Sequence, residues 1–299
     1  MKIGVTGGTG LIGQQLLKEY ADGNVFLVVT AQRNVSQYFQ HEHVQYRFSD
    51  YSTKSLCEHF KDCECLVHLG AKKSSAIDEE SIEQFYVNIS FAETVFKAAH
   101  ALNIPNVINI SSRCVYSPSL VTPYQETITL PLNNYGIAKL CTENIAELYN
   151  QKYAMNIKSL RVAQVISKEL GDNSLFSAYL RQSLAGEMLY VFGEGKSSKE
   201  YIYIKDVCAA IISGCCSQNL KGSFNIGTGI TTSNKELAEM ICKVFHNQKG
   251  YCILKEKRED QLYYLMDVSK AERTLKFKNK FSLTQALEDI KKEMGKLRE

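Results

Sequence analysis

A tyrosine and a lysine stand four residues apart in the segment YGIAK, at Tyr135 and Lys139, and apolar residues follow at helical spacing. On a helix, two side chains at this separation share one face. A phenol with a pKa of about 10 is a poor base at neutral pH, but a lysine ammonium one turn away favours the phenolate. The pair therefore predicts proton transfer to and from a substrate oxygen.

Two serines precede this pair. Ser111 and Ser112 follow the strand-like segment VINI, about 23 residues before Tyr135. A hydroxyl at the carboxyl end of a buried strand faces the ligand crevice of an open α/β sheet. We therefore expect Ser112, Tyr135 and Lys139 to converge on one substrate hydroxyl or carbonyl.

A glycine-rich turn lies near the start of the chain, in TGGTGLIG, between the strand-like KIGVT and a helix beginning near Leu11. The first glycine permits a tight turn, the second lets backbone N–H groups approach a pyrophosphate, and the third lets helix and strand pack closely. No GK[ST] sequence follows, which excludes a P-loop. The turn predicts a bound dinucleotide, with contacts from Gly7, Gly10, Leu11, Ile12 and Gly13.

The second strand-like segment bears on which dinucleotide is bound. Rossmann sites usually place an acid near this strand end to accept the adenosine ribose hydroxyls, but VVTAQRN contains none. Arg33 stands where a guanidinium could pair with a 2′-phosphate. This predicts NADP. The alternative is NAD, with Thr30 or Gln32 bonding a ribose hydroxyl and Arg33 in solvent.

The elements that must position these residues follow from apolar patterning. Strand-like runs alternate with helical periodicity, which is typical of βαβ units. Runs such as LVHLG and VINIS lack polar alternation, as strands buried on both faces do. The pattern predicts an α/β fold with a doubly wound parallel sheet.

Composition excludes several classes of protein. The 299 residues include 35 Lys and Arg against 32 Asp and Glu, a formal charge of +3, so there is no electrostatic footprint for nucleic acid. No apolar run approaches the ~18 residues of a membrane span, and the first residues do not resemble an export signal. We expect a cytoplasmic protein whose ten cysteines are mostly buried thiols.

One cluster could suggest a metal site, because several Cys and His residues occur within a dozen positions. Zinc ligands favour C-x2-4-C pairs in turns, whereas CLVHLG has the pattern of a buried strand. We therefore expect no metal at this cluster, which consists of Cys57, His59, Cys63, Cys65 and His68.

Together these motifs resemble the extended short-chain dehydrogenase/reductase family, specifically its nucleotide-sugar epimerase/dehydratase group. The resemblance runs nearly end to end and depends on the order and spacing of the motifs. They are TGGTGLIG at 6–13, Asp50-Tyr51, HLGA at 68–71, Asn88 in YVNISFAETV, SSRCVY at 111–116, YGIAK at 135–139, LRVAQVIS at 160–167, GEGKSSKEYIYIKDV at 193–207, FNIGTG at 224–229 and DVSKAERTL at 267–275.

The resemblance implies a role for each matching residue. Tyr135 would donate or accept the proton, Lys139 would also hold the nicotinamide ribose, and Ser112 would bind the reacting oxygen. The further implied cofactor contacts are Asp50, Tyr51, Gly70, Ala71, Asn88 and Val162, and the implied substrate contacts are Cys114, Gln164, Lys199 and Arg258. Residues 1–160 would form the cofactor domain, and 161–299 mainly a substrate domain interleaved with late Rossmann elements.

Departures from the family pattern narrow the reaction. Relatives that dehydrate a hexose carry Asp-Glu where this chain has Arg113 and Cys114, so dehydration is disfavoured. Gln164 replaces an asparagine common in relatives, and Lys199 replaces an arginine. Cys114 also stands where related synthases use a cysteine in epimerisation, with a buried structural thiol as the alternative.

The expected function is hydride transfer on a nucleotide-linked sugar, by an epimerase or a ketoreductase. The alternatives are an NADPH-dependent reductase of another small carbonyl compound and a non-catalytic dinucleotide sensor. In relatives, the helices that carry Asn88 and YGIAK form a dimer interface, so the resemblance also implies a homodimer.

Overall fold

The computed structural model describes residues 1–21, 25–32, 35–71, 82–118, 122–169, 174–260 and 262–295. Its largest sheet has seven parallel strands in the order β10-β6-β5-β4-β1-β2-β3. The strand bounds are β1 (Lys2–Thr6), β2 (Phe26–Ala31), β3 (Val44–Phe48), β4 (Cys65–His68), β5 (Asn106–Ser112), β6 (Asn156–Val162) and β10 (Gly222–Ile226). The order reverses between β1 and β4, where doubly wound sheets open their ligand crevice. The predicted fold class is confirmed.

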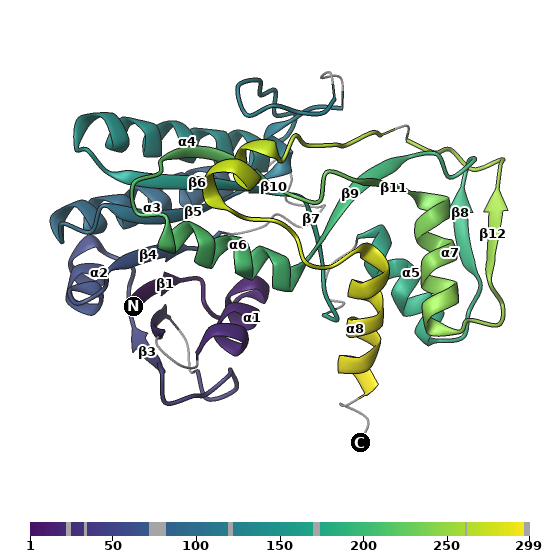
Figure 1. The fold of residues 1–299 in the computed structure, drawn as a ribbon, viewed down its shortest axis with the longest axis horizontal. Helices are drawn as coiled ribbons and strands as arrows, with labels where there is room; N and C mark the ends of the chain where they lie inside the picture. Colours follow the sequence, from purple (N-terminus) through teal and green to yellow (C-terminus); the bar gives the residue numbers. More distant parts are fainter. Residues whose placement is uncertain are drawn as a thin grey trace.

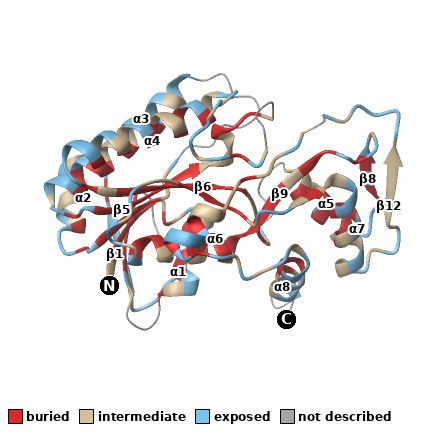
Figure 2. Ribbon diagram, turned by 45° about the horizontal axis from the view of Figure 1, so that its top comes forward, coloured by how far each residue is buried: buried red, intermediate tan, exposed pale blue. Residues whose placement is uncertain are grey.

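Helices cover both faces of this sheet (Figure 1). On one face lie α1 (Leu11–Tyr20) and α6 (Ile204–Cys216), and on the other lie α2 (Thr53–Phe60), α3 (Ile82–Ala101) and α4 (Asn134–Lys152). Alternate strand residues supply the two cores: Ile108 packs in the core that contains Leu16, and Val107 in the one that contains Phe96. Strands β5 and β6 are accordingly buried along almost their whole length, as Figure 2 shows. The edge strand β3 is half-buried to exposed.

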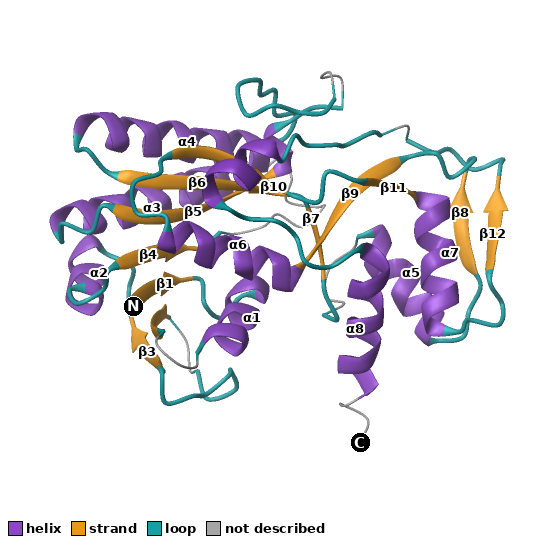
Figure 3. Ribbon diagram, viewed as in Figure 1, coloured by secondary structure: helices purple, strands orange, loops and turns teal. Residues whose placement is uncertain are grey.

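The rest of the chain builds a smaller unit beside the sheet (Figure 3). Its elements are β7 (Gln164–Ile166), α5 (Leu175–Leu184), β8 (Leu189–Phe192), β9 (Ser198–Tyr203), β11 (Thr231–Ser233), α7 (Asn234–Phe245), β12 (Tyr251–Leu254) and α8 (Leu283–Gly295). Leu180, Ile241 and Leu287 belong to its own hydrophobic core. The later elements β10, α6 and the short turn η2 (Ala271–Leu275) pack instead with the core of the main sheet.

The start of α4 is set by a cap and a close backbone approach. The Asn133 side chain accepts a hydrogen bond from Gly136 N at 2.8 Å, which satisfies one of the helix's free N–H groups. A Cβ at Gly136 would collide with the Cys114 carbonyl, so only glycine lets α4 approach this closely. The turn η1 (Arg113–Val115), which follows Ser112, therefore lies directly against the residue after Tyr135.

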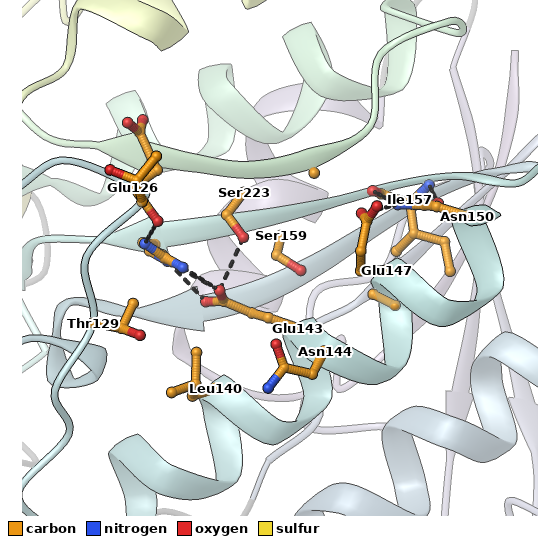
Figure 4. Close-up of a pocket in the computed structure, with 14 residues that line it drawn as sticks. Glu126, Thr129, Leu140, Glu143, Asn144, Glu147, Asn150, Ile157, Ser159 and Ser223 are labelled. Atoms are coloured by element: carbon orange, nitrogen blue, oxygen red, sulfur yellow. Dashed lines mark hydrogen bonds and ion pairs between the residues drawn. The ribbon is translucent and has the colours of Figure 1, made fainter.

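A buried ion pair fastens the middle of α4 to the sheet. Arg161 Nη2 lies 2.6 Å from Glu143 Oε2, and both side chains are almost fully buried. Glu143 also accepts hydrogen bonds from the hydroxyls of Ser111 on β5 and Ser223 on β10. Figure 4 shows Glu143 and Ser223 pointing toward each other beside a cavity of about 240 Å³. One carboxylate thus joins α4 to β5, β6 and β10.

We expect Glu143→Ala to lower the free energy of unfolding by about 3–5 kcal/mol, because it leaves the Arg161 charge buried without its partner. Urea denaturation would measure the change. The matched control is Asp62→Ala, which removes an exposed pair with Lys2 and should have little effect. Equal losses for the two variants would show that the buried pair does not fasten α4.

Candidate active site

A cavity of about 480 Å³ opens at the carboxyl ends of β1, β4, β5 and β6. It joins residues that the sequence places as much as 158 positions apart, from Gly7 to Val165. The predicted site residues that line it are Gly7, Gly10, Leu11, Ile12, Gly13, Ala71, Ser112, Cys114, Tyr135, Val162 and Gln164. The predicted glycine turn therefore shares one cavity with Ser112 and Tyr135, whereas Lys139 and Gly70 are not among the lining residues.

The glycine turn lets segments of the backbone approach one another closely. Gly7 has a φ of +74°, and a Cβ there would lie 2.5 Å from the amide nitrogen of Gly70 on the chain that leaves β4. A Cβ at Gly13 would lie 2.5 Å from the Cα of Gly8, inside the same turn. Because the glycines of this turn carry no side chains, the first N–H groups of α1 are left open toward the cavity. Sites that bind phosphate at a helix N-terminus have the same arrangement. These residues fit a dinucleotide pyrophosphate.

The predicted adenosine end of the site lies beside β2. Strand β2 ends at Ala31, and Gln32 after it is exposed, so no acid closes the strand. The Tyr51 hydroxyl donates a hydrogen bond to the Thr30 carbonyl at 3.1 Å, while Asp50 before it is exposed. Arg33, on which the NADP prediction depends, lies outside the described residues.

The acid–base pair occupies one face of α4, where burial controls both groups. Lys139 Nζ donates to the Ile110 carbonyl at 2.6 Å and lies 5.7 Å from the centre of the Tyr135 ring. Burial lowers the pKa of Lys139 to about 8, although the nearby Glu143 carboxylate opposes this shift. With three donors and one hydrogen bond to the described residues, Lys139 retains donors that fit ribose hydroxyls.

The pKa of Tyr135 moves opposite to the sequence prediction. Burial raises it above its ordinary value, and the neighbouring Cys114 raises it further. Desolvation of the phenolate is the largest cause of this rise. In this structure burial therefore favours the protonated phenol at neutral pH, and the lowering of its pKa by Lys139 stays a prediction.

Ser112 keeps its hydroxyl available. Its Oγ accepts a hydrogen bond from Cys114 N at 3.1 Å, so its own proton remains free to donate to a substrate oxygen. Cys114, half-buried, lines the cavity beside it. Arg113, which we did not predict as a site residue, also lines the cavity and donates from Nη2 to Gln164 Oε1 at 3.1 Å. The only signal for it in the sequence was its departure from the family pattern.

Three other predicted residues lie apart from the cavity lining. Asn88 is buried on α3, and Lys199 is half-buried on β9, where burial and the positive charge of Arg113 lower its pKa. The Arg258 side chain is 92% exposed and forms an ion pair with Asp260 at 3.8 Å. Their predicted ligand contacts stay predictions.

The two histidines of the Cys and His cluster at 57–68 form hydrogen bonds within the fold. His68 on β4 shares a 2.8 Å hydrogen bond between its Nδ1 and the Thr6 hydroxyl, and burial lowers its pKa to about 3. His59 bonds the Phe48 carbonyl through Nε2. In the described parts of the chain, no group of three or more His, Cys, Asp or Glu side chains is arranged to hold a metal ion. No described helix is both long and apolar enough to cross a membrane.

Comparisons with known proteins agree with this geometry. A "Putative UDP-glucose 4-epimerase" of Methanocaldococcus jannaschii is 25% identical over 96% of each chain. The crystal structure of UDP-N-acetylglucosamine 4-epimerase from Bacillus cereus matches with a TM-score of 0.88 and 28% identity, over 98% of this chain and 99% of that one. UDP-glucuronic acid 4-epimerase from Bacillus cereus, in complex with UDP-glucuronic acid and NAD, has the same fold: its TM-score is 0.84, its identity is 22%, and 99% and 100% of the two chains are covered.

The family model described as "NAD dependent epimerase/dehydratase family" matches residues 3–227, about three quarters of the chain, including the glycine turn, Ser112, Tyr135 and Lys139. This confirms the family resemblance inferred from the motifs: the chain belongs to the NAD dependent epimerase/dehydratase family, within the extended short-chain dehydrogenase/reductases.

Proposed function

We propose that this protein is an epimerase that inverts one carbon of a UDP-linked sugar. The observation that carries the proposal is the convergence of the glycine turn, Ser112 and Tyr135 on one cavity, with Lys139 behind the tyrosine. The similar proteins named above support the substrate class. Dehydration is disfavoured, because Arg113 and Cys114 replace the acidic pair on which dehydratases of the family depend.

Each residue has a task in this reaction. A nicotinamide dinucleotide held by the glycine turn and Lys139 would supply the ring carbon that takes up and returns a hydride. Ser112 donates a hydrogen bond to the reacting hydroxyl oxygen, which orients it toward Tyr135. Tyr135 exchanges the proton of that hydroxyl, and Lys139 holds the ribose and provides positive charge near the phenol. Inversion requires the sugar to present its other face before the hydride returns.

The raised pKa of Tyr135 bears on this step. Abstraction of the hydroxyl proton requires the phenolate, which burial disfavours. Additional positive charge beside the ring must offset desolvation, and Lys139, protonated below about pH 8, is the cation in place. A dinucleotide with an oxidised, positively charged nicotinamide would add to it.

Tyr135→Phe should lower turnover by about 10²–10⁴-fold, because it removes the group that exchanges the proton. Binding of the dinucleotide, measured by calorimetry, should change little. Lys139→Met should weaken both binding and turnover, since one ammonium has two tasks. Tyr190→Phe, on β8, is the control and should behave as the unmodified protein does. Near-normal epimerisation by Tyr135→Phe would refute the assignment.

The assay itself separates the alternative functions. An epimerase interconverts two UDP-sugars with no net consumption of dinucleotide. A ketoreductase would oxidise one reduced dinucleotide for each product formed. A non-catalytic sensor would bind the dinucleotide with no turnover.

We propose NAD as the cofactor. The family is described as NAD dependent, and a structure with the same fold was solved with NAD. These comparisons do not support the preference for NADP that the sequence predicted from Arg33. Calorimetry with both dinucleotides should show NAD binding at least as tightly as NADP. Tighter binding of NADP by about 10- to 100-fold, lost in Arg33→Ala, would overturn this proposal in favour of the guanidinium–phosphate contact.

We also propose a homodimer formed through α3 and α4. These helices expose large apolar side chains, among them Tyr86, Val87 and Leu148, which are 60%, 38% and 62% exposed. Light scattering should give about twice the chain mass of 33.7 kDa, and Leu148→Glu should weaken the association. A mass equal to one chain at all concentrations would exclude the dimer.

A further inference from the structure

Arg113 is the one charged side chain among the described residues that line the active-site cavity, and no acid lines it. It follows Ser112 directly, at the start of η1. A group bound beside the oxygen that Ser112 holds therefore lies near this side chain. This places a cation next to the reacting part of the substrate.

Two contacts hold the guanidinium in place. Nη2 donates to Gln164 Oε1 at 3.1 Å, and the guanidinium carbon lies 4.6 Å from the centre of the Tyr264 ring. The partners come from β7 and from the segment after β12, so they fix the group from two separate elements. Gln164 and Arg113 both depart from the family pattern, and the structure brings them into contact. An oriented guanidinium is suited to planar, two-point recognition of an anion.

The charge of Arg113 is not balanced within the described part of the protein. No described carboxylate lies within ion-pair distance of it. Glu200 is near enough to be affected by its charge, but the Glu200 oxygens accept hydrogen bonds from the backbone N–H groups of Thr228, Gly229 and Met266. The other neighbouring charge is Lys199, a second cation. A half-buried cation without a counterion favours a ligand that brings one.

Two parts of a UDP-sugar could bring negative charge, the pyrophosphate and the sugar. The position of Arg113 beside Ser112 favours the sugar, because Ser112 is the residue proposed to hold the reacting sugar oxygen. Lys199 and Arg258, given above as implied substrate contacts, are the cations that the family resemblance places near the pyrophosphate. Resting on the function proposed above, we propose that Arg113 binds a carboxylate carried by the sugar, and that the substrate is therefore a UDP-linked sugar acid.

Calorimetry on the NAD-loaded protein tests this with four probes: UDP, UDP-glucose, UDP-glucuronic acid and UDP-N-acetylmuramic acid. We expect a sugar acid to bind about 10- to 100-fold more tightly than UDP-glucose, the range of a charge-assisted hydrogen bond. The last two probes distinguish a carboxylate at C6 from one on a substituent of C3. In Arg113→Gln the preference should vanish, with UDP binding unchanged, and Arg113→Lys should retain part of it.

Controls separate this inference from the proposed function. Lys196→Gln removes an exposed cation on the loop before β9 and should leave all four affinities unchanged. Unchanged NAD binding would show that Arg113→Gln is folded. Equal losses for UDP and for every UDP-sugar would assign Arg113 to the pyrophosphate and overturn the inference, as would equal binding of neutral and acidic sugars. If none of the UDP-sugars binds, the proposed function fails together with it.

Discussion

The buried pair of Glu143 and Arg161 is the constraint on which the site depends. Tyr135, Lys139 and Glu143 follow one another at single-turn intervals, so a contact that fixes Glu143 also fixes the other two side chains. Removing a carboxylate and a guanidinium from water is costly, and this cost is offset only by close geometry and several hydrogen bonds. The pair meets that condition through Arg161, Ser111 and Ser223. Ser111 also precedes Ser112, so one carboxylate positions both sides of the reaction centre.

Close backbone approaches complete the arrangement. Gly136 allows α4 to rest against the Cys114 carbonyl, and Gly7 allows β1 to touch the chain leaving β4 at Gly70. Both contacts lie at the carboxyl ends of parallel strands, where the cavity opens. The sheet therefore supplies rigidity, and the glycines allow the close backbone approach that a dinucleotide pyrophosphate requires.

Features that depend on neighbours along the chain were predictable from the sequence. The glycine turn, the helical pair Tyr135 and Lys139, and the parallel sheet all follow from local spacing and apolar patterning. Features that depend on burial or on distant segments were not. The pKa of Tyr135 depends on how far the folded chain excludes water, and periodicity carries no such information. The contact between Arg113 and Tyr264 joins residues 151 positions apart. The pairing of β8 with β12 likewise joins distant segments, and no sequence motif indicates it.

The charges around the cavity impose a further condition on any substrate. Arg113 is close enough to Lys199 to disfavour the charge of that lysine, while Glu200 accepts hydrogen bonds from backbone N–H groups. An incoming anion would relieve this unfavourable interaction between the two cations. A substrate whose only charge is on its pyrophosphate would place an anion at one end of the cavity. It would leave Arg113, the cation beside Ser112, without a partner. The cation that replaces the dehydratase acid, and so disfavours dehydration, is thus the same group by which we propose that the site selects the charge of the sugar.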